Sequence, residues 1–75
     1  MNFVERTARR IRGTVLEVLP VTGLAYVKDE GAGTWAITKS TRGVGLDTLR
    51  QGQRVELTIS DYDDCALVSG YAPLD

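Results

Sequence analysis

The side chains best suited to a chemical role in this sequence are cations of the kind that bind phosphate. Four of them are expected on or near one strand surface: Arg12, Lys28, Lys39 and Arg42. The arginines of the N-terminal segment would add to the same patch: Arg6, Arg9 and Arg10. Acidic residues gather elsewhere, at Asp61, Asp63, Asp64 and Asp75. A surface polarised in this way gives a near-neutral protein a local phosphate-binding patch, although an ordinary solvated surface accounts for the same charges equally well.

Nothing in the sequence predicts catalysis. The chain has no histidine, which excludes imidazole as a general acid or base and as a zinc ligand. Serine, threonine and lysine occur, but no motif places a base beside any of them. The run from Asp61 to Asp64 lacks the regular ligand spacing of a calcium loop and is interpreted as a solvated turn. We therefore predict a protein that is not an enzyme, needs no cofactor or metal, and has no small-molecule substrate.

Length and charge restrict the remaining classes of function. The chain has 75 residues, enough for one small domain. Nine Lys and Arg side chains stand against ten Asp and Glu, for a net charge of −1, so nucleic acid would have to bind at a local patch. No apolar run approaches the roughly 20 residues that span a membrane, and no signal peptide is recognisable. We expect a cytoplasmic protein without membrane contact.

Residues 1–12 are predicted to form a separate, arginine-rich extension. Its apolar residues fall near helical spacing: Phe3, Val4, Ala8 and Ile11. Asn2 suits a helix N-cap and Gly13 suits a helix end, so a short helix is one interpretation. The other is a loose tail that runs into the first strand, and the sequence favours neither.

From Gly13 onward the pattern predicts β-strands. The first ends before Pro20, because proline cannot donate a hydrogen bond to a strand ladder. The other four cover residues 24–28, 34–38, 54–60 and 65–71. Within the fourth, alternate residues are expected to face inward: Val55, Leu57 and Ile59. Cys65, the only cysteine, begins the fifth and is predicted to be buried and inert.

A long irregular link separates the third predicted strand from the fourth. Residues 39–53 contain three glycines and lack strand alternation, with one helical turn expected near 46–49. Five short strands with this spacing predict an all-β fold, a five-stranded antiparallel barrel of the oligonucleotide/oligosaccharide-binding (OB) type over residues 13–75. A closed barrel would also remove the exposed edges of a small sheet.

The chain resembles the bacterial cold-shock protein family over residues 13 to about 60. Gly13-Thr14-Val15 matches that family's opening G-x-V, and Gly23 falls ten residues later, where the family has K-G-F-G-F-I. The segment from Thr34 to Thr38 lies at the family's D-V-F-V-H, and the segment from Leu49 to Val55 matches L-x-x-G-Q-x-V. The resemblance implies the OB fold and binding of RNA or single-stranded DNA.

A second resemblance is to the small bacterial translation initiation factor that consists of one OB domain. The segment from Gly13 to Pro20 is similar to its opening strand, and the segment from Gly52 to Thr58, followed by Tyr62-Asp63, is similar to its fourth strand and turn. Where that family carries a basic K-M-R-K stretch, this chain has residues 39–43, Lys-Ser-Thr-Arg-Gly. The resemblance implies the same fold and a nucleic-acid partner.

The cold-shock resemblance implies a base-stacking platform of which little remains. Tyr26 keeps an aromatic ring, whereas Leu24 replaces a phenylalanine and Thr38 replaces a histidine. Ala36 replaces another phenylalanine, and Glu17 puts a negative charge where the family has an exposed tryptophan. Trp35 aligns with an inward-facing valine and is expected in the core. The predicted nucleic-acid-binding residues are Arg12, Leu24, Tyr26, Lys28, Thr38, Lys39 and Arg42.

Two functions follow as hypotheses. The first is a cold-shock-like module that binds single-stranded RNA or DNA weakly and with little sequence preference. The second is an OB domain that has exchanged base stacking for contact with a protein partner, for example as a ribosome- or transcription-associated protein, with Leu24, Tyr26 and Ala36 as a docking patch. The acidic isoelectric point of about 5.3 favours the second, and the basic residues favour the first.

Overall fold

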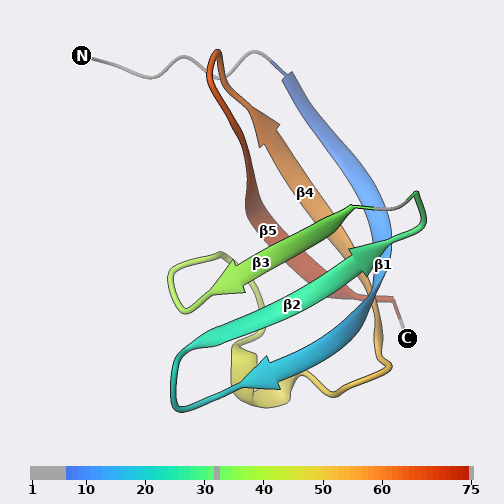
Figure 1. Ribbon diagram of the computed structural model, residues 1–75, viewed down its shortest axis with the longest axis vertical. Coiled ribbons are helices and arrows are strands. Elements are labelled where there is room, and N and C mark those ends of the chain that lie inside the picture. Colours follow the sequence, from blue (N-terminus) through green and yellow to red (C-terminus); the bar gives the residue numbers. More distant parts are fainter. Residues whose placement is uncertain (1–6, 32, 75) are drawn as a thin grey trace.

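The fold is a single curled sheet of five antiparallel strands. The structure, a computed structural model, describes residues 7–31 and 33–74. The strands are β1 (Thr7–Leu19), β2 (Leu24–Asp29), β3 (Thr34–Thr38), β4 (Arg54–Asp61) and β5 (Ala66–Pro73). A short 3-10 turn, η1 (Leu46–Thr48), lies in the link between β3 and β4. The all-β, antiparallel prediction is confirmed, and the sheet order β3-β2-β1-β4-β5 forms a half-barrel consistent with an OB-like barrel (Figure 1).

Strand β1 is the shared strand of the half-barrel. Its N-terminal part pairs with β4, from Thr7 opposite Asp61 to Thr14 opposite Arg54. Its C-terminal part pairs with β2, and a bulge between Val15 and Glu17 shifts the register there. A bulge increases local twist and bends the strand, which lets one strand serve both halves of the sheet.

Gly13 stands where the two pairings of β1 meet. It lies opposite Asp29 of β2 and opposite Val55 of β4. A Cβ atom at this position would lie 2.7 Å from the carbonyl oxygen of Lys28 and 2.7 Å from a methyl carbon of Val27. Only glycine therefore permits the close approach of β1 and β2 at this bend.

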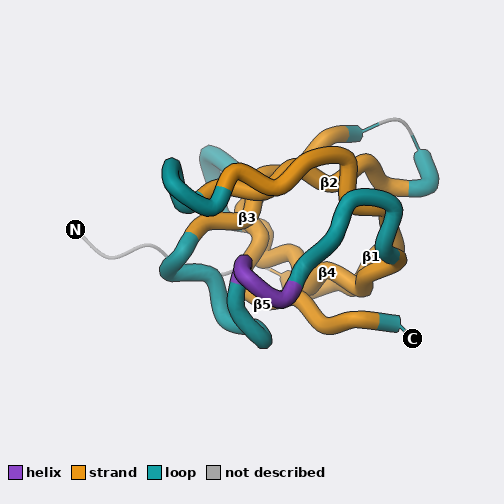
Figure 2. Tube along the Cα trace, turned by 90° about the horizontal axis from the view of Figure 1, so that it is seen from below, coloured by secondary structure: helices purple, strands orange, loops and turns teal. Residues whose placement is uncertain are grey.

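The core fills the concave side of the sheet. Val55, Leu57 and Ile59 of β4 are fully buried, which confirms the alternation predicted for this strand. The remaining buried apolar residues come from the other strands and the link: Val15, Ala25, Val27, Ile37, Leu46, Leu49 and Tyr71. Figure 2 shows the strands curled around this interior, with η1 across its lower end. The turn at η1 thus contributes Leu46 to the core, near the position expected for a helical turn.

The two outer strands approach each other through the link that follows β3. Arg42 forms an isolated parallel bridge with Gly70 of β5, and its carbonyl oxygen accepts a hydrogen bond of 2.9 Å from the backbone N–H of Tyr71. This contact draws the β3 side of the half-barrel toward β5.

The described part of the N-terminal extension differs from both interpretations of the sequence. Residues 7–12 are neither helix nor tail but the first half of β1, hydrogen-bonded to β4. Ile11 packs against the core while Arg10 and Arg12 face solvent, so the segment alternates as a strand does. Residues 1–6 lie outside the described residues. Over the described chain, no helix is long and apolar enough to cross a membrane.

The prediction that Cys65 is buried is wrong. Strand β5 begins one residue later, at Ala66, and Cys65 is exposed with a free thiol. Its carbonyl oxygen accepts a 2.8 Å hydrogen bond from the backbone N–H of Tyr62, which closes the turn between β4 and β5. The residue therefore belongs to the turn, where its side chain is directed away from the core.

Candidate nucleic-acid interface

The outward side of β1, β2 and β3 carries the predicted base-binding residues in cross-strand rows. The central row places Tyr26 of β2 between Glu17 of β1 and Ala36 of β3. Tyr26 is partly exposed, whereas its neighbours in β2, Ala25 and Val27, are fully buried. The small Ala36 leaves one flank of the tyrosine ring open, and Glu17 sets a carboxylate on the other.

The row at the end of β2 is apolar on one side and polar on the other. Leu24 lies opposite Leu19 of β1 and opposite Thr38 of β3. The Thr38 hydroxyl lies 3.0 Å from that of Ser40 and 3.3 Å from that of Thr41, so it belongs to the turn after β3. These contacts orient Thr38 and leave Leu19 and Leu24 as the apolar members of the row.

Two of the predicted cations flank this surface. Lys28 is exposed, and the register sets it opposite Thr14 of β1 and Thr34 of β3. Lys39 follows β3, and its aliphatic carbons lie across Gly23, so closely that a Cβ atom there would be 2.5 Å from Lys39 Cε. One cation therefore stands near each end of strand β2.

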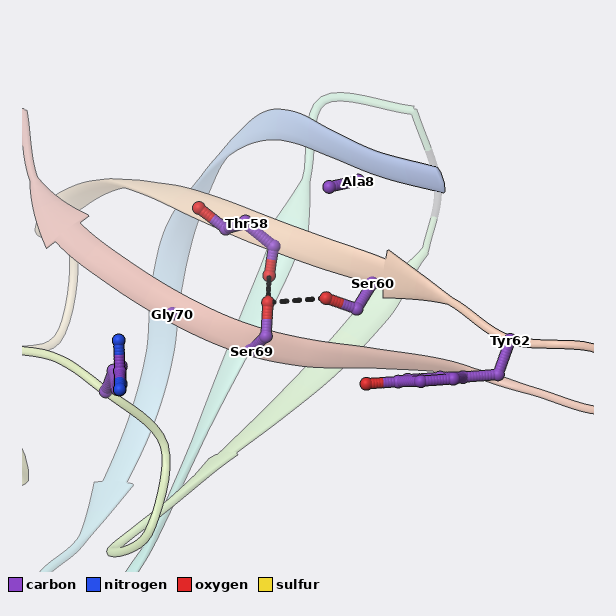
Figure 3. A pocket seen from close by; sticks show the side chains of 7 residues that line it. Ala8, Thr58, Ser60, Tyr62, Ser69 and Gly70 are labelled. Atoms are coloured by element: carbon purple, nitrogen blue, oxygen red, sulfur yellow. Dashed lines mark hydrogen bonds between the residues drawn. The ribbon is translucent and has the colours of Figure 1, made fainter. Parts of the chain in front are cut away.

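Arg12 and Arg42 lie elsewhere than expected from the sequence. Arg12 is on the outward side of β1 where that strand pairs with β4, opposite Glu56. Arg42 is not on the β2–β3 surface, because the link after β3 carries it to β5. There it lines a hollow with Thr58, Ser69 and other residues of β4 and β5 (Figure 3).

Trp35 stands beside the first half of β1 as part of a polar cluster. Its ring is partly buried and packs against the core, and its indole Nε1 donates a 2.7 Å hydrogen bond to Asp29 Oδ2. The Arg9 guanidinium lies over the same ring, 5.9 Å from its centroid. Arg9 also forms an ion pair with Asp61, with 3.0 Å between Nε and Oδ2. These contacts leave the indole in a structural role.

Asp61 raises the pKa of the Arg9 guanidinium above its ordinary value, first through their hydrogen bond and then through its charge. Burial acts in the opposite direction, and the charge of Asp29 adds a further increase. A cation whose pKa is raised stabilises the fold at every pH below its ordinary pKa, and this stabilisation is lost only as the pH rises through the raised value. Arg9 therefore stays charged throughout the physiological range.

Asp29 was not singled out from the sequence, yet it organises the turn between β2 and β3. Its Oδ1 accepts hydrogen bonds from the backbone N–H groups of Gly31, at 2.8 Å, and Gly33, at 3.0 Å. The signal was present, because an aspartate followed two residues later by glycine is typical of a side-chain-stabilised turn. What the sequence did not reveal is that the other carboxylate oxygen holds Trp35.

No protein-family model matches the chain, and no curated protein matches it. Among solved structures, the chain is similar to CusF in its Ag(I) form, with a TM-score of 0.64 and 10% sequence identity. The match covers 89% of this chain and 97% of the other. At this identity the likeness shows a shared fold and nothing of function.

The Ag(I) ion belongs to that neighbour, and this chain has few donor atoms that suit a soft cation. Soft cations are held in proteins by thiolates and thioethers. This chain has no histidine, one cysteine and one methionine, of which Cys65 is exposed in a turn and Met1 lies outside the described residues. Within the part of the chain that the structure describes, no three His, Cys, Asp or Glu side chains converge as a metal site.

Proposed function

We propose that this protein binds single-stranded RNA or DNA, weakly and with little sequence preference, through the outward side of β1, β2 and β3. The observation that carries the proposal is that Tyr26 and Lys28 project from the same side of β2, two residues apart. Residues at this spacing on a strand are about 6.6 Å apart, which suits a ring that stacks on a base and a cation that contacts its phosphate.

The architecture supports this choice of surface. We assign the half-barrel to the OB type, in which the face of strands 2 and 3 binds oligonucleotides. The strand order and the bridge between Arg42 and Gly70 support the assignment, because they bring the β3 and β5 sides together.

The same surface accounts for weak binding. A stacked base contributes about 1–3 kcal/mol, and Tyr26 is the one aromatic residue in the three rows described above. Glu17, directly across from Tyr26, repels a phosphate backbone that passes over β1. Affinity is therefore expected to depend strongly on the remaining cations and to fall as salt rises.

The test is a fluorescence anisotropy titration of labelled oligo-dT and oligo-U of about seven nucleotides, at low and at physiological salt. The unchanged protein is expected to bind both, and Tyr26→Ala combined with Lys28→Ala is expected to weaken binding at least about tenfold. Tyr26→Phe, which keeps the ring, is the control for stacking. Arg50→Ala, which removes an exposed charge from the link before β4, is the control for net charge. The proposal would be contradicted if the protein did not bind at low salt, or if the double substitution left the affinity unchanged.

A second candidate is a protein-interaction module that uses the apolar part of the same surface. Leu16, in the bulge of β1, is 41% exposed, and Leu24 lies opposite Leu19 in the row at the end of β2. This apolar group favours a protein partner, whereas Lys28 favours nucleic acid. The two candidates differ in their response to Leu24→Asp and to nuclease. A protein partner would be lost on the substitution and retained after nuclease treatment, and an oligonucleotide complex would be abolished by nuclease.

A further inference from the structure

The outward side of β1, β4 and β5 carries a groove with an arginine on each side, here called the arginine-flanked groove. One continuous row of backbone pairs defines it. Arg10 of β1 lies opposite Thr58 of β4, Thr58 lies opposite Gly70 of β5, and Gly70 is bridged to Arg42. Neighbouring strands are about 4.8 Å apart, so three steps separate the Arg10 and Arg42 backbones by roughly 14 Å.

The floor of the groove is hollow because its residues are small. Gly70 has no side chain and Thr58 has a short one, between two long arginines. Two adjoining hollows of about 400 and 450 Å³ share Arg42, Thr58 and Gly70 in their linings. The first continues along β4 and β5 to Tyr62 (Figure 3).

Hydroxyl groups line that first hollow. The Ser60 hydroxyl donates a 2.8 Å hydrogen bond to Ser69 Oγ, which in turn donates at 3.3 Å to the Thr58 carbonyl oxygen (Figure 3). Ser60 is the one buried polar residue among the described residues, with 2% of its surface exposed. A polar floor beneath two cations suits a hydrated anion better than an apolar side chain.

The two flanking arginines differ from two other arginines of the sheet, Arg9 and Arg54. Arg9 is paired with Asp61 and Arg54 with Glu30, so their charges are matched. Neither Arg10 nor Arg42 forms an ion pair with any residue in the ranges 7–31 and 33–74. Glu56 is the one carboxylate in the lining of the second hollow. It faces Arg12 in the register and leaves the positive charge in excess.

The groove is continuous with the surface that contains Tyr26. Arg10, Arg12 and Thr14 alternate on the outward side of β1, and Thr14 lies opposite Lys28. Cations therefore lie along the way from Lys28 over β1 to Arg10 and Arg42, beside Asp29, which is bonded to Trp35, and Glu30, which is paired with Arg54. A guanidinium group binds phosphate oxygens through a planar pair of N–H donors. It therefore suits contact with a nucleic-acid backbone that does not depend on the base sequence.

We propose that the arginine-flanked groove binds the phosphodiester backbone of the same single strand whose bases contact Tyr26. The inference rests on the proposed function and adds a second contact region to it, on the opposite half of the sheet. Binding at Tyr26 and Lys28 needs only a few nucleotides. Contact with Arg10 and Arg42 requires a strand long enough to pass over β1.

The test compares oligo-dT of about five and about fifteen nucleotides, each titrated over a range of salt concentrations. Arg42→Gln and Arg10→Gln are each expected to weaken binding of the longer strand about three- to tenfold and to reduce its salt slope by about 0.7, while the shorter strand binds as before. Arg42→Gln keeps the backbone hydrogen bond to Tyr71, so the fold is retained. Arg50→Gln is the matched control and is expected to change neither length.

Each possible result supports or overturns the proposed role of the groove. Equal weakening of both lengths would place Arg10 and Arg42 in a general electrostatic role and overturn the inference, as would an unchanged affinity for the longer strand. Failure of the unchanged protein to bind either length would overturn the proposed function and the groove together. If affinity did not depend on strand length and oligoglutamate displaced the longer strand, the groove would be assigned to acidic peptides instead.

Discussion

The hydroxyl of Tyr71 accepts a hydrogen bond from the backbone N–H of Gly45, with 2.9 Å between the two atoms. Tyr71 is 6% exposed, and its own backbone N–H donates to the carbonyl oxygen of Arg42. One residue of β5 thus holds the link between β3 and β4 at two points. The position of Arg42 over the groove depends on this attachment.

Removal of the Tyr71 hydroxyl is expected to destabilise the fold. Tyr71→Phe leaves the Gly45 N–H without its acceptor in a partly buried place, which costs about 1–2 kcal/mol of the free energy of unfolding. Urea denaturation measures the loss. Tyr26→Phe is the control, because the Tyr26 ring lies on the outward face, and it is expected to change the free energy by less than about 0.5 kcal/mol. Equal effects of the two substitutions would show that the Gly45 contact contributes nothing.

Gly43 allows the Tyr71 ring to lie against the link. A Cβ atom at Gly43 would overlap ring atoms of Tyr71, and the buried ring cannot move away without disturbing the core. Gly43→Ala is therefore expected to lower the free energy of unfolding by about 1–3 kcal/mol. Gly70→Ala serves as the matched control, because its nearest neighbour would lie at an ordinary 3.7 Å. Thermal unfolding of the two variants tests the difference, and a smaller loss for Gly43→Ala than for Gly70→Ala would refute it.

Glu17 is expected to oppose nucleic-acid binding. It lies directly opposite Tyr26, so Glu17→Gln removes a negative charge from the path of the phosphate backbone. Removal of a unit charge that lies roughly 6 Å from a phosphate in water is expected to raise affinity about threefold, and the gain should shrink as salt rises. Anisotropy titration with oligo-dT provides the measurement. Asp64→Asn, in the exposed turn between β4 and β5, is the control, and a gain of the same size there would rule out a local effect.

The exposed thiol of Cys65 is expected to react in the folded protein. A thiol in a turn needs no unfolding to meet a reagent, so modification by a disulfide reagent should proceed within about tenfold of the rate in denaturant. A thiol buried in a strand would instead be protected by the stability of the fold. A modification rate about a hundredfold or more below that in denaturant would show instead that the Cys65 thiol is buried.

We expect Asp29→Ala to lower the free energy of unfolding more than Trp35→Phe does. Asp29→Ala removes acceptors for the N–H groups of Gly31, Gly33 and Trp35, and we expect a loss of about 2–3 kcal/mol in the free energy of unfolding. Trp35→Phe removes one of these bonds and keeps most of the ring packing, with an expected loss of about 1–2 kcal/mol. Chemical denaturation of both variants decides the order. A larger loss in Trp35→Phe would locate the stability in ring packing rather than in the carboxylate.

The elements that the sequence predicted well are those determined by neighbouring residues. The third predicted strand, 34–38, is β3, and the alternation of Val55, Leu57 and Ile59 is that of β4. Alternation over a few residues is a local property of a strand with one buried face. The inward packing of Trp35 was also foreseen, although the polar partners of its indole were not.

The features that the sequence did not predict depend on residues far away in the chain. Residues 7–12 become a strand because β4, some fifty residues later, supplies their backbone partners, as the register pair Arg9 and Ile59 illustrates. Arg42 lies over β5 because Tyr71 and Gly70 hold the link there. The sequence near residue 10 or residue 42 does not indicate these distant partners. The location of the groove therefore could not be inferred from the local sequence.

The division of β1 between two partners has a consequence for the order in which the chain is synthesised. When residues 7–38 have left the ribosome, β2 and β3 can already pair with the second half of β1, but β4 has yet to appear. Until it does, the first half of β1 is an unpaired edge of the kind that recruits other chains into aggregates. The charges of Arg9, Arg10 and Arg12 along that edge discourage such pairing. These arginines are therefore expected to protect the nascent chain from aggregation until β4 is available.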